Sequence, residues 1–137
     1  MIDPALLREN PDLVKRSQAA RGASPEAVDA ALSADADRRA AITAFEALRA
    51  EQNAFGKQVA QAPKDEKAAL VAQAKSLAEQ VKAAQHAVTA AEEVAAEAMG
   101  RIQNIIIDGV PPGGEKDFVE LRHVGQAPTF DFEPRDH

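Results

Sequence analysis

The sequence contains no cysteine, no tryptophan and no tyrosine, and only five of its 137 residues are phenylalanine. Without cysteine the chain can form neither a disulfide bond nor a thiolate metal site. The apolar share is 45%, but much of it is alanine, which fills little volume. We therefore expect an elongated arm in which helices approach closely, rather than a thick globular core.

Two further absences concern membranes and export. No apolar run approaches the roughly 20 residues that a membrane-spanning helix needs. The N-terminus lacks the basic and then apolar pattern of a signal peptide. These features predict a cytoplasmic protein with no membrane partner.

The most informative pattern that is present is a pair of heptad stripes, in which apolar residues recur at spacings of four and three. The first stripe consists of Ala41, Phe45, Leu48, Gln52, Phe55, Val59 and Ala62. The second consists of Leu70, Ala74, Leu77, Val81, Ala84, Val88, Ala91, Ala95, Ala98 and Ile102. Such a sustained repeat is typical of a coiled-coil seam.

The short break between the stripes, residues 62–65, indicates that the two helices fold back on each other as an antiparallel hairpin. We predict a mainly α-helical fold, with short N-terminal helices in residues 1–24, a coiled-coil arm in 25–100 and a linker with short strands in 101–137. Within the arm, one helix is expected from about Pro25 to Ala62 and the other from about Asp65 to Gly100.

The two ends of the chain carry weaker signals. Asp3-Pro4 and Asn10-Pro11 have the chemistry of helix starts, and Gly22 suits the position just past a helix end. In the tail, residues 118–124 and 130–132 read as short extended or β segments. So little sheet is marginal without a further surface on which to pack.

Charge is segregated along the arm, although the formal net charge of the chain is −6. Between residues 38 and 82 eight basic residues stand against five acidic ones, whereas the flanking helix ends carry only acids. The candidate nucleic-acid-binding residues are Arg38, Arg39, Arg49, Lys57, Lys64, Lys67, Lys75 and Lys82. Long cationic side chains on a rigid helix suit contacts with an RNA backbone, which proteins read mainly by shape and phosphate position.

Other interpretations of these cations remain open. Lysine and arginine on a coiled coil often only solubilise the helix or pair with acids one turn away. Arg38 and Arg39 have Asp35 and Asp37 within reach, and Lys64 and Lys67 are next to the acids of the turn. The three histidines offer no metal-ligand spacing, and His86 is most simply a solvated helix residue.

Both ends of the sequence resemble bacterial seryl-tRNA synthetases. Residues 1–12 (MIDPALLRENPD) are similar to the start of that family, and residues 130–137 (FDFEPRDH) to the segment that leads into its catalytic domain. The order of parts also agrees, including a Val110-Pro-Pro-Gly turn and a Val119-Glu-Leu-Arg strand. One departure is Gln103-Asn104, which stands where the family usually has a Pro-Asn pair.

The resemblance implies that the arm binds the long variable arm and elbow of serine tRNA. It also implies a parent class II enzyme, a homodimer formed through its catalytic domain, that activates serine with ATP and Mg²⁺. This chain resembles the N-terminal part alone, so it is expected to contain no catalytic residue, metal or cofactor site and to be inactive by itself. The rival hypothesis is a coiled-coil hairpin that binds proteins, as a chaperone or scaffold module, but the turn (AQAPKDEK) is too polar to grip apolar clients.

Overall fold

The computed structural model describes residues 2–126 and 128–135, so Met1, Ala127, Asp136 and His137 lie outside the described residues. Four α-helices follow one another: α1 (Pro4–Glu9), α2 (Pro11–Ala20), α3 (Glu26–Gln61) and α4 (Lys67–Gly100). A single 3-10 turn, Glu115–Asp117, follows in the tail. The mainly helical fold predicted from the heptads is therefore confirmed.

The short helices begin and end where the sequence chemistry predicts. The Asp3 carboxylate accepts a hydrogen bond from the Ala5 N–H at 2.7 Å, and proline stands at the start of both α1 and α2. After α2, Gly22 adopts φ +71°, a left-handed conformation that glycine reaches without penalty. The Gly22 and Ala23 N–H groups then bond to the last carbonyls of the helix, which is the Schellman arrangement.

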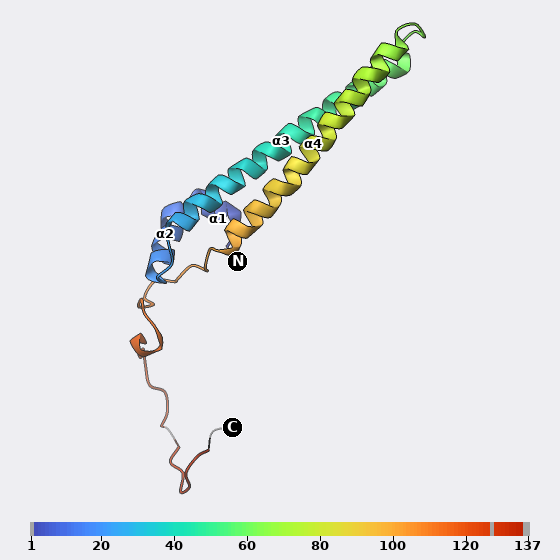
Figure 1. The fold of residues 1–137 in the computed structure, drawn as a ribbon. Coiled ribbons are helices and arrows are strands. Elements are labelled where there is room, and N and C mark those ends of the chain that lie inside the picture. Colours follow the sequence, from blue (N-terminus) through green and yellow to red (C-terminus); the bar gives the residue numbers. More distant parts are fainter. Residues whose placement is uncertain (1, 127, 136–137) are drawn as a thin grey trace. The chain divides into compact units, whose positions relative to one another are not determined.

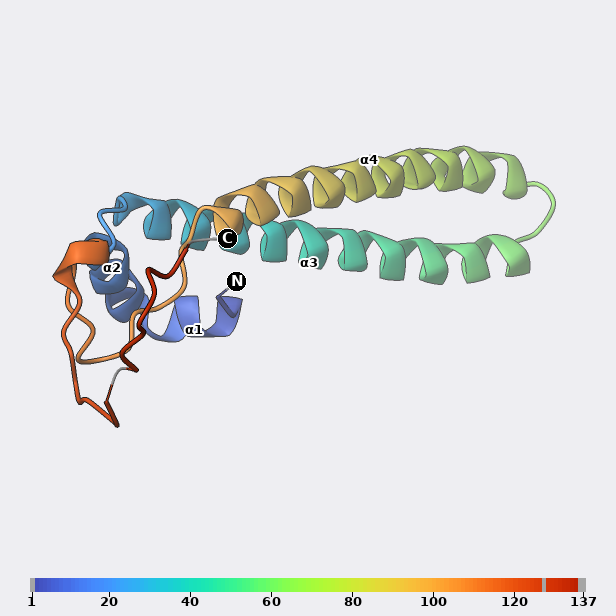
Figure 2. The same cartoon turned by 90° about the horizontal axis from the view of Figure 1, so that it is seen from below.

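The two long helices pack side by side in opposite directions and are joined by a turn at residues 62–66 (Figures 1 and 2). At 1.5 Å per residue they measure about 54 and 51 Å. Every residue predicted for the two heptad stripes is buried or half-buried in the hairpin. The antiparallel coiled coil is confirmed, with α4 starting two residues later than expected.

The tightly packed core lies at the root of the arm, where α1 and α2 lie against the first turns of α3 (Figure 2). It consists of Ile2, Leu7, Val14, Val28, Ala31 and Ile102. Leu7, Val14 and Val28 are completely inaccessible to solvent. The short N-terminal helices therefore serve to enclose the open end of the hairpin.

The structure divides the chain into two units, residues 2–106 and the described part of 107–135. In the second unit the prediction of short strands is wrong for the described residues, which form extended chain, turns and the 3-10 turn but no strand. Two short segments with no surface to cover gain too little from pairing to hold a sheet. Their large apolar side chains stay exposed, Leu121 at 90% and Phe118 at 77%.

No helix in the described part of the chain is both long enough and apolar enough to cross a bilayer.

Candidate nucleic-acid interface

The eight predicted cations are distributed over both helices of the arm and its turn. Arg38, Arg39, Arg49 and Lys57 lie on α3, Lys64 lies in the turn, and Lys67, Lys75 and Lys82 lie on α4. Arg38 is half-buried and the other seven are exposed. The structure separates them into two groups with different surroundings.

The first group, called here the outer cations, has no carboxylate partner in the described part of the chain. Its members are Arg49, Lys57, Lys64, Lys67, Lys75 and Lys82. None of them forms an ion pair with another residue in ranges 2–126 and 128–135. The interpretation of these lysines as partners of neighbouring acids therefore finds no support in the structure.

Arg49 differs from the lysines because it stacks on the seam. Its guanidinium carbon lies 5.7 Å from the centre of the Phe45 ring, one helical turn back. This cation–π contact restricts the arginine side chain, which is still exposed to solvent. Phe45 itself is half-buried on the coiled-coil seam, as its heptad position predicts.

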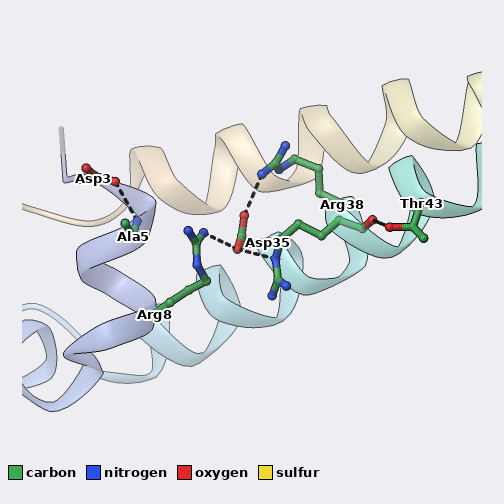
Figure 3. Close-up of polar contacts among 7 residues, drawn as sticks. Asp3, Ala5, Arg8, Asp35, Arg38 and Thr43 are labelled. Carbon is green, nitrogen blue, oxygen red and sulfur yellow. Dashed lines mark hydrogen bonds and ion pairs between the residues drawn. The ribbon is translucent and has the colours of Figure 1, made fainter. Parts of the chain in front are cut away.

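The second group, Arg38 and Arg39, is engaged with a buried carboxylate, which was the alternative left open by the sequence. Figure 3 shows the Asp35 carboxylate between Arg38 of α3 and Arg8 of α1. Arg38 Nη2 donates to Oδ1 at 3.0 Å, whereas Arg39 Nε and Arg8 Nη1 donate to Oδ2 at 3.1 and 3.0 Å. Only 3% of Asp35 is accessible to solvent.

The ionisation of Asp35 follows from this geometry. Burial by itself raises the pKa of the carboxyl group, but the hydrogen bonds from Arg38, Arg8 and Arg39 outweigh it, so that the pKa lies below the ordinary value of 3.8. The carboxylate is thus held charged, and it joins α1 to α3.

Arg8 was not identified from the sequence, because it is 27 positions from Asp35 and no local spacing connects them.

The acidic root of the arm is also less negative than its sequence suggests. Asp29 pairs with Lys15 of α2 at 2.7 Å, and Glu97 with Arg101 at 2.6 Å. The hydrogen bond to Asp29 raises the pKa of Lys15, which favours the charged form.

The path by which the chain leaves α4 is fixed by α2. The fully buried Gln18 side chain donates to the Gln103 carbonyl at 2.8 Å and accepts from the Gln103 N–H at 3.0 Å. The Ser17 hydroxyl accepts from the Ile106 N–H at 2.9 Å, and Arg21 Nε donates to the Asn104 carbonyl at 2.8 Å. A proline at 103 has no N–H to donate, so the departure from the Pro-Asn pattern provides one of these bonds.

The described residues of the arm offer no set of side chains that could bind a metal or a cofactor. No three His, Asp or Glu side chains of the described residues come together as metal ligands. The groove between the helices is lined by Glu51, Phe55, Gln73, Ser76, Leu77 and Gln80, none of which is basic. ATP and Mg²⁺, which the resemblance implies for a parent enzyme, do not fit these residues.

Comparisons with known proteins agree with this architecture. The family model for the seryl-tRNA synthetase N-terminal domain matches residues 1–106. The serine–tRNA ligases of Leifsonia xyli and Clavibacter sepedonicus are 61% and 58% identical over the whole chain, which covers 32% of each relative. That of Acidothermus cellulolyticus is 55% identical, with 33% of its length covered.

A solved structure gives the same result for the fold. The seryl-tRNA synthetase of Pyrococcus horikoshii, crystallised with ATP, superposes with a TM-score of 0.75 at 27% identity. The match covers 85% of this chain and 27% of that protein. The chain therefore spans about a third of the length of the curated relatives that it matches.

Proposed function

This chain belongs to the family of seryl-tRNA synthetase N-terminal domains, and from that premise we propose that its helical hairpin is a tRNA-binding arm. The observation that supports this most directly is the set of outer cations. They are spread along a narrow, solvated rod and have no carboxylate partners among the described residues. Unpaired cations at fixed intervals are what a sequence-independent contact with phosphates requires.

The spacing of the cations suits a backbone contact. Lys75 and Lys82 are seven residues apart and share one face of α4 at a separation of about 10.5 Å along the axis. Arg49 and Lys57 lie about 12 Å apart along α3. Because the helices are rigid, these charges select a ligand by the shape of its phosphate chain rather than by its bases.

We propose serine tRNA as that ligand, with the contact on its long variable arm and elbow. A long variable arm is a distinctive duplex, so shape alone can distinguish this tRNA from others. When the arm binds the tRNA in this way, it would direct the acceptor end of the tRNA to a catalytic domain elsewhere in the parent protein.

The whole enzyme is proposed to be a cytoplasmic class II serine–tRNA ligase that acts as a homodimer. It would activate serine with ATP and Mg²⁺ and then transfer it to tRNA, using the two thirds of its relatives' length that this chain does not cover. The exposed apolar side chains of the tail, among them Phe118 and Leu121, would then pack on that catalytic domain.

The protein-binding alternative is less consistent with the surface of the arm. A hairpin that grips client proteins needs apolar residues exposed at its tip, whereas residues 63–69 are all exposed and include Lys64, Asp65, Glu66 and Lys67. We therefore favour RNA over a protein client.

The test is a filter-binding titration of the chain against serine tRNA and against a tRNA with a short variable arm. The proposal predicts tighter binding of serine tRNA, with an affinity that falls steeply as salt increases. Equally negligible affinity for both tRNAs at low salt would refute it. Saturable binding of a denatured, apolar client instead would favour the scaffold hypothesis.

A further inference from the structure

We propose that Arg8, Arg38 and Arg39, gathered on the buried Asp35 carboxylate, form a preorganised phosphate site for the RNA backbone at the inner end of the arm. This inference rests on the proposed tRNA-binding function and adds two residues to it. Arg8 is a binding residue that no local sequence pattern indicates, and Asp35 is a positioning residue that acts through the arginines.

The geometry leaves most of the hydrogen-bonding capacity of the arginines unused. A guanidinium carries five N–H donors, and each of these three directs one hydrogen bond to Asp35. The side chains of Arg8, Arg38 and Arg39 remain 39%, 31% and 54% exposed. The Asp35 side chain is only 4% exposed, so the arginine donors that it does not use are the part of the cluster that a ligand can reach.

The charge of the cluster points to an anion. Three guanidiniums surround one carboxylate, and no other carboxylate of the described residues lies within ion-pair distance of them. A single bidentate arginine would neutralise Asp35, so a purely structural bridge does not need the other two. The surplus of two positive charges in one place favours an anionic ligand.

Phosphate is the anion that this arrangement fits best. The planar guanidinium fork matches pairs of phosphate oxygens, and arginines from two helices can approach the same group from different directions. Arg38 and Arg39 lie on α3, which also carries Arg49 and Lys57. One RNA backbone can therefore contact this cluster and the outer cations along the same helix.

Asp35 lowers the entropic cost of binding. Free arginine side chains lose rotamer freedom when they grip a ligand, but these three are already fixed by hydrogen bonds to a buried acceptor. The outer lysines have no such support. The cluster is thus expected to contribute more affinity per charge than Lys75 or Lys82.

The decisive variant is Asp35→Asn, because two physical explanations predict opposite changes in its affinity for serine tRNA. If only net charge matters, removing a negative charge tightens RNA binding. If Asp35 positions the arginines, the affinity for serine tRNA falls about tenfold despite the more favourable charge. Asp37→Asn is the matched control: it makes the same charge change on exposed α3 surface, at a residue without an ion pair in the described chain, and should bind as tightly as wild type or slightly more so.

A second pair of variants keeps the inference testable if Asp35→Asn disturbs folding. Arg8→Gln leaves the carboxylate paired with Arg38 and Arg39 and should reduce the slope of log affinity against log salt by about one. Arg16→Gln removes the same charge from an exposed site on α2 that has no ion pair among described residues, and should change the slope less. Circular dichroism and urea unfolding show whether each variant remains folded.

Different results would refute the phosphate site and the proposed tRNA-binding function. If wild type binds serine tRNA but Asp35→Asn and Arg8→Gln behave like their controls, the phosphate site is refuted and the tRNA-binding arm stands. A titration with inorganic pyrophosphate, followed by the NMR signals of the arginine Nε–H groups, tests the site without RNA. Saturable shifts in wild type that Asp35→Asn abolishes support the site even if tRNA does not bind, and unchanged signals overturn it.

Discussion

The root of the arm and its outer part share helices α3 and α4, but α1 and α2 pack only at the root, and the side chains of the two regions are used differently. At the root, Leu7, Val14 and Val28 are fully buried, and the acids Asp29, Asp35 and Glu97 are paired. In the outer part, residues 36–92, the best-buried described side chains are Leu77, Val81 and Val88 at 6–8% exposed, and the outer cations have no carboxylate partners among described residues.

This difference has a geometrical cause. Two helices alone can cover a seam only from one side, so Phe45, Leu48 and Phe55 remain half-buried. A third layer is required to exclude water completely, and α1 and α2 supply it only at the root. We infer that the root provides stability and the outer part provides a charged surface.

Replacing a buried leucine tests the first half of this comparison and should have the largest effect. Leu7→Ala leaves a cavity in the root core and is expected to reduce the free energy of unfolding by about 3 kcal/mol. Leu13→Ala makes the same change at a residue that is 37% exposed, so it should cost less than about 1 kcal/mol. Urea unfolding measures both, and equal losses would show that the root is not the stabilising region.

Two glutamines, Gln18 at the root and Gln52 in the outer part, test the same difference through side-chain hydrogen bonds. Gln18→Ala leaves the Gln103 N–H and carbonyl without partners in a part-buried setting and should cost about 2 kcal/mol. Gln52→Ala alters a half-buried seam position whose side chain forms no hydrogen bond with another described residue, and the expected loss is under about 0.5 kcal/mol. If both variants unfold at the same urea concentration, the bonds from α2 do not stabilise the root.

Lowering the pH should reduce the stability of the root, because the Asp35 carboxylate becomes protonated. Because its pKa in the folded chain is below 3.8, the ionised group adds stability that is fully present at higher pH and is lost as the pH falls through the lowered pKa. The difference in unfolding free energy between wild type and Asp35→Asn should therefore shrink from pH 7 to pH 3. A difference that does not change with pH would contradict this assignment.

The sequence predicted those features that depend on local spacing. Heptads place Leu48 and Val81 on the seam, and Asp3-Pro4 starts α1, because both signals act within one or two turns. The pairing of Arg8 with Asp35 and of Gln18 with Gln103 depends on how helices dock, and residues 27 and 85 positions apart share no local pattern.

In the tail, a local sequence pattern led to a wrong prediction. Its alternating residues predicted strands, yet alternation only makes a segment suitable for a sheet and does not supply a partner. Phe118 and Leu121 are exposed in the described tail, so the apolar face that would stabilise a sheet has nothing to cover.

The most direct test of the account is the salt dependence of serine tRNA binding by a variant with Arg49, Lys57, Lys75 and Lys82 all changed to glutamine. If these cations hold phosphates, the slope of log affinity against log salt becomes shallower by about three to four while helicity is unchanged. A slope and an affinity equal to those of wild type would show that the outer part of the arm does not bind the RNA backbone.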